Sequence, residues 1–174
     1  MAHDILADSV ADPPRFLVDR MLGRLVKWLR ILGYDTAYLP QLSPQGLLRE
    51  GRRQGRMILT RDTQFIRQKN VPPFVFVRAD RFRDQLQQVV EACQLDPTRF
   101  LFTRCSDCNA LLDVIEKEEI HAQVPAYVWE TQSEFRQCPG CHRLYWGATH
   151  KEHVQAELQQ MGLAGGHHEE GGNG

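Results

Sequence analysis

The sequence predicts an α/β domain with a parallel sheet, covered by helices on both faces and followed by a small module built around cysteines. Over residues 15–95, short apolar runs alternate with segments of helical periodicity, which is typical of parallel strands joined by helical crossovers. From residue 100 onward the pattern changes to short β segments around two cysteine pairs. A chain of 174 residues, 42% hydrophobic and 25% charged, is long enough for one ordinary domain and a small module.

The order of the elements follows from the apolar runs and their stop signals. We expect strands over residues 15–19, 36–39, 57–60 and 74–77. We expect helices over residues 20–32, 44–54, 62–69, 81–93 and 149–161. The second helix has the clearest limits, because Ser43 suits an N-cap, Pro44 suits the first helical position and Gly55 suits the end.

These elements divide the chain into four parts. We expect a disordered leader over residues 1–14, the α/β domain over 15–95, the cysteine module with its closing helix over 100–160, and a disordered Gly-rich tail over 164–174. The start of the chain lacks the basic region of a signal peptide, and no apolar run approaches the ~18 residues of a membrane span. We therefore expect a cytoplasmic protein with no membrane partner.

The formal net charge of −1 hides a strong asymmetry. Residues 15–104 carry 17 Lys/Arg and 8 Asp/Glu, a charge of +9, whereas residues 105–174 carry 4 Lys/Arg and 11 Asp/Glu, a charge of −7. A basic block of this size favours a polyanionic partner such as a nucleic acid. The alternative is a well-solvated arginine-rich surface with no such partner.

The pairs Cys105-x-x-Cys108 and Cys138-x-x-Cys141 are separated by 29 residues and are typical of a four-thiolate Zn²⁺ site. Each pair presents two sulfurs to one ion, and two pairs complete a tetrahedron. We therefore expect a structural zinc ribbon with no open coordination position. The alternatives are unrelated thiol pairs, a redox pair, or a ligand supplied by His142.

Three aspartates follow the carboxyl ends of expected strands, where open parallel sheets bind their ligands. Asp19 ends the first strand, Asp62 follows the third and Asp80 follows the fourth. Clustered carboxylates bind Mg²⁺ or Mn²⁺, so we predict a catalytic divalent metal site here, with Thr60 orienting a carboxylate or a water. The alternative for each aspartate is a helix N-cap.

Cations lie close to these aspartates in the sequence and suit phosphate oxygens. On the first helix, opposite its apolar face, a basic stripe is formed by Arg20, Arg24, Lys27 and Arg30. The stripe begins beside Asp19, so we interpret it as a track for a nucleic-acid backbone, although a solvated helix face is the alternative. The candidate nucleic-acid contacts are Arg20, Arg24, Lys27, Arg61 and Arg78.

Three segments together resemble a known family. They are FLVDRMLGRLVKWLRILGYD over residues 16–35, ILTRD over 58–62, and the cysteine pairs followed by RLYW over 143–146. The segments resemble the opening, the second acidic motif and the zinc ribbon of the Mut-seven C-terminal RNase domain family, over about residues 15–155. The resemblance implies a PIN-like fold and a metal-dependent RNase with Asp19 and Asp62 at its centre.

One position departs from the family pattern. Domains of this type carry an acid at the start of the helix between the second and third strands, and here that stretch is Ser-Pro-Gln45-Gly-Leu. Glu50 follows one turn later as a possible substitute. The first hypothesis is therefore a ribonuclease that hydrolyses single-stranded RNA. The second is a non-catalytic RNA-binding module with a structural zinc ribbon, and neither defines a protein partner.

Overall fold

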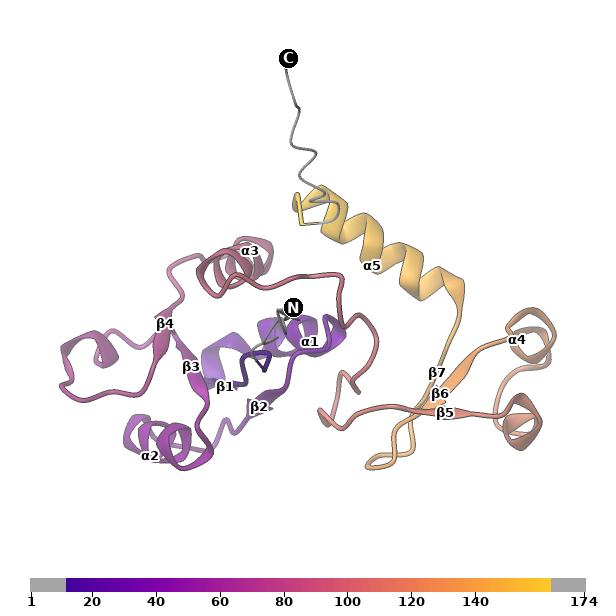
Figure 1. The fold of residues 1–174 in the computed structure, drawn as a ribbon, viewed down its shortest axis with the longest axis horizontal. Helices are drawn as coiled ribbons and strands as arrows, with labels where there is room; N and C mark the ends of the chain where they lie inside the picture. The colour runs from indigo at the N-terminus through magenta and orange to yellow at the C-terminus, as the bar shows by residue number, and fades with distance from the viewer. Residues whose placement is uncertain (1–11, 164–174) are drawn as a thin grey trace, which may run out of the picture.

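The computed structural model describes residues 12–163. The first part of the chain contains a four-stranded sheet whose strands all run parallel, in the order β2-β1-β3-β4 (Figure 1). The strands are β1 (Phe16–Val18), β2 (Thr36–Tyr38), β3 (Met57–Thr60) and β4 (Phe74–Phe76). All four predicted strands are confirmed, and each lies within its predicted segment. The expected leader, up to residue 11, and the expected tail lie outside the described residues.

The helices of this part are α1 (Gly23–Ile31), α2 (Pro44–Gln54) and α3 (Phe82–Ala92). The limits of α2 are as predicted, because the Ser43 hydroxyl accepts a hydrogen bond from the Gly46 amide at 3.2 Å and Gly55 adopts a φ of 60°. Only a left-handed backbone closes the helix in this way, and glycine adopts it at little cost.

Two predicted helices differ in detail. The helix expected from residue 20 begins with a 3-10 turn, η1 (Arg20–Leu22), because the Asp19 side chain accepts a hydrogen bond from the Met21 amide and so sets a tight first turn. The helix expected over residues 62–69 is wrong, since only the 3-10 turn η2 (Phe65–Arg67) forms there. Phe65 is the one buried residue of that turn, so the segment lacks the apolar face of a longer helix.

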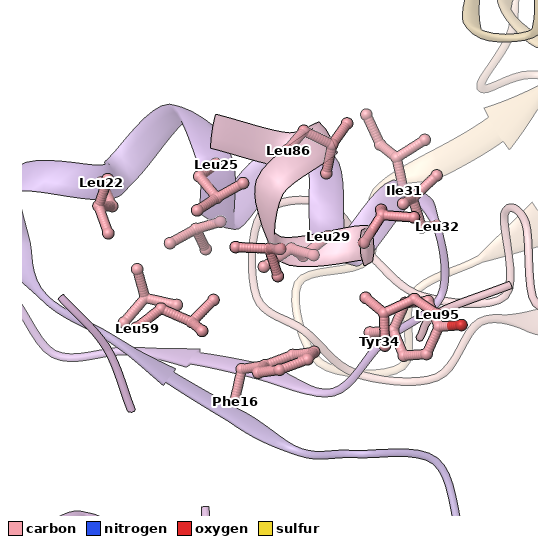
Figure 2. Close-up of a cluster of buried hydrophobic side chains, with 14 of the residues drawn as sticks. Phe16, Leu22, Leu25, Leu29, Ile31, Leu32, Tyr34, Leu59, Leu86 and Leu95 are labelled. Atoms are coloured by element: carbon pink, nitrogen blue, oxygen red, sulfur yellow. The ribbon is translucent and has the colours of Figure 1, made fainter. Parts of the chain in front are cut away.

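The strands alternate their side chains between two hydrophobic clusters, one on each face of the sheet. The larger cluster packs α1 and α3 against Phe16, Val18 and Leu59. Figure 2 shows Leu25 and Leu29 of α1 above Phe16 and Leu59 of the strands, with Leu86 of α3 beside them. On the other face, Leu17 and Ile58 pack against α2 and η2. The prediction of helices on both faces is confirmed.

The second part of the chain contains a three-stranded antiparallel sheet in the order β5-β6-β7. Its strands are β5 (Asp113–Ile115), β6 (Phe135–Gln137) and β7 (Leu144–Trp146). Between β5 and β6 lie a 3-10 turn, η3 (Lys117–Ile120), and a short helix, α4 (Ala126–Thr131), whereas the sequence predicts only short β segments before the closing helix. Both pack a separate small core around Ile120, Val128 and Phe135.

The last helix, α5 (Ala148–Gln160), leaves the small sheet and returns to the α/β part (Figure 1). Its buried residues Val154 and Leu158, with Met161 just beyond it, belong to the same hydrophobic cluster as α1 and α3. Helix α5 therefore completes a core that β1, α1 and α3 form on one face of the sheet. None of the helices in the described part of the chain is long and apolar enough to cross a membrane.

Candidate functional site

The carboxylate of Asp19 lies at the carboxyl end of β1 and is held by donors from three directions. One oxygen, Oδ1, accepts a hydrogen bond from the Met21 amide at 2.7 Å. The other, Oδ2, accepts from the Thr60 hydroxyl at 2.6 Å and from the Arg61 amide at 2.8 Å. The residue is 8% exposed, so these bonds fix its orientation firmly. The predicted N-cap role is real, but it uses only one of the two oxygens.

Asp62 reaches the same place from the neighbouring strand β3. Its Oδ1 accepts a hydrogen bond from the Gln64 amide at 2.8 Å, while its own amide donates to the Thr60 hydroxyl at 3.0 Å. Thr60 therefore lies between the two aspartates, as a donor to one side chain and an acceptor from the backbone of the other. In the described part of the chain, Oδ2 of Asp62 has no hydrogen-bond partner.

Asp19, Thr60 and Asp62 line one cleft of about 640 Å³ at the carboxyl edge of the sheet. Arg20 and the start of α2 complete its walls. Adjacent parallel strands β1 and β3 bring these residues together, as the strand-end rule predicts. The cleft thus offers carboxylate oxygens and an arginine side by side.

Asp80 lies outside this cleft. Its side chain is 90% exposed, lines a neighbouring hollow with Arg24 and Phe82, and accepts a hydrogen bond from Arg61 Nη2 at 2.5 Å. The same guanidinium donates to the Ala79 carbonyl at 2.6 Å. Arg61 therefore connects β3 to the loop after β4. Within residues 12–163, the three aspartates do not form a group with ligand atoms close enough to share one ion.

The cations of the predicted stripe divide into two kinds. Arg20, Arg24 and Lys27 are exposed, and the Arg24 guanidinium lies 4.0 Å from the centre of the Phe82 ring. Arg78 is exposed after β4. Arg30 does not belong to a solvent-facing track, because it is 8% exposed and its Nε donates to the Thr36 carbonyl at 2.9 Å.

The start of α2 brings no acid into the cleft. Gln45 is exposed, and the cleft is lined at this point by Ser43 and Leu47, neither of which carries a carboxylate. Glu50 does not replace the missing acid, since it does not line the cleft and its carboxylate accepts hydrogen bonds from Arg53 and Gln54. Those bonds lower the pKa of Glu50 to about 2.

The four cysteines of the second part form the one group in the described residues suited to hold a metal ion through three or more Cys, His, Asp or Glu ligands. The sulfurs of Cys105, Cys108, Cys138 and Cys141 all lie within 4.8 Å of one another. Four sulfurs at this spacing match the tetrahedral donor set of Zn²⁺, so the site could hold that ion. His142 is exposed and is not part of the group.

The two cysteine pairs have the same backbone geometry. The amide of the fourth residue, Cys108 or Cys141, donates to the first sulfur at 3.5 and 3.4 Å. The residue after each pair, Asn109 or His142, has a positive φ of 72° or 59°, and its amide donates to the carbonyl of the first cysteine. The two turns therefore hold their four sulfurs around a common centre, and in each turn a backbone amide donates a hydrogen bond to the first sulfur.

The first cysteine pair is fastened to the α/β part by polar contacts. Arg30 donates through Nη1 to the carbonyls of Ser106 and Asp107, at 3.3 and 2.6 Å. The Asn109 side chain accepts from the Thr36 amide at 2.9 Å and donates to an Asp35 oxygen at 2.7 Å. These contacts lie at the beginning of β2, which is the opposite edge of the sheet from Asp19.

The carboxyl group of Asp35, which takes part in this contact, has a strongly lowered pKa. Its partial burial opposes ionisation, but hydrogen bonds from Arg56 and Asn109 outweigh this effect and lower the pKa of Asp35 to about 2. Arg56 is itself buried and donates to both Asp35 oxygens, at 2.7 and 3.2 Å. Asp35 directly precedes β2, at the edge of the sheet away from the aspartate cleft, and this position in the sequence favours a structural role.

Tyr145 is a residue of the metal site that the cysteine spacing does not reveal. Its hydroxyl lies 3.0 Å from the Cys105 sulfur and accepts a hydrogen bond from the Ser106 amide at 3.2 Å. The ring of Tyr145 therefore packs beside the first cysteine pair. Its place in the RLYW segment, directly after the second pair, was the available signal.

A parallel sheet with aspartates at its carboxyl edge, joined to an antiparallel module with four clustered cysteines, defines an α/β domain followed by a ribbon with a candidate zinc site. The family model of the Mut7-C RNAse domain matches residues 14–158, so the chain belongs to that family. The resemblance drawn from the sequence is confirmed. Searches of curated proteins and of solved structures found no match.

Proposed function

We propose that the protein is a metal-dependent ribonuclease that hydrolyses single-stranded RNA in the cleft between Asp19 and Asp62. The observation that carries this proposal is the shared cleft, in which Thr60 links the two aspartates. Membership of an RNase domain family supports RNA as the substrate. The excess of basic residues in the α/β part supports a polyanion.

The donor set of the cleft fits one Mg²⁺ or Mn²⁺ ion. Asp62 Oδ2 is free of hydrogen bonds from described residues, and Asp19 Oδ1 accepts only one, which leaves it a second lone pair. Mg²⁺ commonly binds through one or two carboxylates and keeps several waters. When bound, such an ion supplies charge neutralisation for the phosphate and an activated water.

The residues of the chain supply binding and orientation. Thr60 and the Arg61 amide hold Asp19 so that its free lone pair stays in the cleft. Arg20 lines the same cleft and would hold a phosphate oxygen, while Arg24, Lys27 and Arg78 would hold the flanking backbone. Hydrolysis would leave a 5′-phosphate and a 3′-hydroxyl.

Asp80 would act indirectly, through its ion pair with Arg61. Its carboxylate neutralises and positions Arg61, whose backbone amide binds Asp19. As a direct metal ligand, Asp80 would first have to leave that ion pair. Asp80→Asn distinguishes the two roles. Loss of a metal ligand would raise the Mn²⁺ concentration needed for half-maximal cleavage, whereas loss of a positioning contact would lower the cleavage rate at all Mn²⁺ concentrations.

The four cysteines would hold a structural Zn²⁺, with no coordination position left for catalysis. A thiolate site of this kind is stable in a reducing compartment, which supports the cytoplasm as its location. This ion would stabilise the ribbon and the contact between the ribbon and the sheet edge.

A second function, RNA binding without cleavage, is favoured by one observation. The start of α2 brings no carboxylate into the cleft, and Glu50 is held by Arg53 and Gln54 away from it. The cleft then contains only Asp19 and Asp62 as acids among the described residues, one fewer than the family pattern with its acid at the start of this helix. Such a protein would bind RNA with the same basic residues and leave it intact.

The deciding experiment measures cleavage and binding of the same RNA pool. We expect the wild type to cleave in Mn²⁺, and Asp62→Asn to bind RNA with unchanged affinity but to cleave at least a hundredfold more slowly. Gln64→Ala is the control, because it retains the amide that contacts Asp62. Wild-type binding without cleavage in Mn²⁺ or Mg²⁺ would establish the second function instead.

A further inference from the structure

A second cavity lies where the ribbon meets the α/β part, away from the aspartate cleft. It has a volume of about 200 Å³ and lies between the end of α1, the loop over residues 101–106, strands β6 and β7, and the start of α5. Drug-sized sites are roughly 300–1,000 Å³, so this cavity suits a single planar ring system. Neither the cleavage proposal nor the zinc site uses it.

The lining of the cavity combines apolar, aromatic and cationic side chains. Leu101 and Phe102 form an apolar part, and Tyr145 and Trp146 of β7 add two aromatic rings. Tyr145 is fixed by its hydroxyl contacts with Cys105 and Ser106, whereas Trp146 keeps 39% of its surface exposed. A fixed aromatic surface beside an accessible indole is suited to stacking a base.

The charges point to the same ligand. Residues 105–174 carry 11 acids and only four Lys/Arg. Two of those four, Arg136 and Lys151, line this cavity. The Lys151 ammonium lies 3.3 Å from Glu134, but its side chain is 47% exposed and can rotate toward a ligand. Arg104 and Glu134 also line the cavity, so its charged lining is three cations and one carboxylate, a net positive charge that suits the phosphate of a nucleotide.

We propose that this cavity binds one nucleotide, with its base stacked on Trp146 and its phosphate held by Lys151 and Arg136. The proposal rests on RNA as the ligand of the protein. Helix α1 (Gly23–Ile31) follows the 3-10 turn after Asp19 and ends at the cavity with Ile31, and the helix itself is roughly 13 Å long at 1.5 Å per residue. The exposed Arg24 and Lys27 lie between, so one RNA strand can occupy both places.

The test uses a ten-nucleotide RNA that carries 2-aminopurine, whose fluorescence falls on stacking, without added Mg²⁺ or Mn²⁺. We expect Trp146→Ala to weaken binding about tenfold and remove the quenching, and Lys151→Gln to weaken it about threefold. Tyr127→Ala and Lys117→Gln are matched controls, because they remove an exposed aromatic ring and a cation of the same module outside the cavity. Both controls should bind like the wild type.

Adenosine 5′-monophosphate as a competitor identifies the source of the nucleotide. Displacement of the RNA signal by it indicates a site for free nucleotides, and binding of RNA alone indicates a site within a strand. Affinities of Trp146→Ala and Lys151→Gln within twofold of the wild type would overturn the proposal. If those affinities are unchanged but the wild type cleaves RNA in Mn²⁺, the proposed ribonuclease activity stands without the nucleotide cavity. If quenching depends on Trp146 but no cleavage occurs in Mn²⁺, the nucleotide cavity stands without the ribonuclease activity. Unchanged thermal unfolding and zinc content of each variant would show that the fold is retained.

Discussion

The guanidinium of Arg30 donates a 2.6 Å hydrogen bond to the main-chain carbonyl of Asp107, 77 residues later in the chain. Through Nε, the same group binds the Thr36 carbonyl at the beginning of β2. One buried cation thus joins α1, the sheet and the first cysteine pair. Burial lowers the pKa of Arg30, and the negative charge of the cysteine pair acts in the opposite direction, so the guanidinium suits this position.

Replacement of Arg30 should separate the ribbon from the sheet edge. We expect Arg30→Met to lower the free energy of unfolding by about 3 kcal/mol, because buried carbonyls lose charged donors. Zinc affinity should fall about tenfold, since the donors that orient the cysteine loop are lost. Calorimetry and competition with a zinc chelator measure the two effects. Lys27→Met, an exposed change on the same helix, should alter neither value.

The ion pair of Asp35 predicts a pH dependence of stability. A folded-state pKa of about 2, below the usual value of 3.8, means that the stabilisation is fully present above about pH 4 and is lost as pH falls toward 2. The shift corresponds to about 2 kcal/mol at neutral pH. Asp35→Asn should therefore be less stable at pH 7, and the difference should shrink toward pH 2.

This difference is measured by guanidinium unfolding of both proteins across pH 7 to pH 2. Because Asp35 contacts Asn109 beside the cysteine pair, the zinc content of both proteins is measured at each pH, and stabilities are compared only at equal zinc content. A constant difference between them over this range would show that the contribution of Asp35 does not depend on its charge.

Removal of one zinc ligand should unfold the ribbon. We expect one Zn²⁺ per chain in protein purified without chelator, and its loss in Cys105→Ser together with the β5–β7 sheet, because a module of this size depends on its metal. Metal analysis and far-ultraviolet circular dichroism measure both. Cys93→Ser, outside the cluster, should retain the metal. Full zinc content in Cys105→Ser/Cys138→Ser would refute the four-thiolate site.

The exposed cations of α1 should set the salt dependence of RNA binding. We expect the double variant Arg24→Ala/Lys27→Ala to reduce the slope of log affinity against log salt by about 1.4, at about 0.7 for each phosphate contact with a single strand. Filter binding between 50 and 200 mM salt measures the slope. Arg67→Ala/Lys69→Ala removes two exposed cations outside the cleft and should leave it unchanged. An equal slope in both variants would return the α1 cations to an ordinary solvated surface.

The sequence was sufficient for the sheet because its strands are short apolar runs whose neighbours in the chain are helices. The aspartates at strand ends were placed correctly at one edge, but the rule does not give the partner of each side chain. Asp80 follows its strand as predicted, and yet its carboxylate binds Arg61 instead of lining the cleft. Local position fixes an edge, whereas side-chain pairing depends on the loop that follows.

Arg30 shows a second limit of sequence patterns. Its spacing from Arg24 and Lys27 places it on the polar face of a helix, where solvent is the usual environment. The cysteine module covers that end of the face, and the covering segment lies more than seventy residues away. The short helix α4 was missed for a related reason, because six residues carry too little periodicity to predict one.

The return of α5 to the first core sets the order in which the protein can fold during synthesis. Residues of β1, α1 and α3 leave the ribosome well before Val154 and Leu158, which fill the remaining part of their shared cluster. Until those two side chains emerge, the nascent α/β part exposes an apolar surface to water. Completion of that part therefore waits until the ribbon and α5 have been translated.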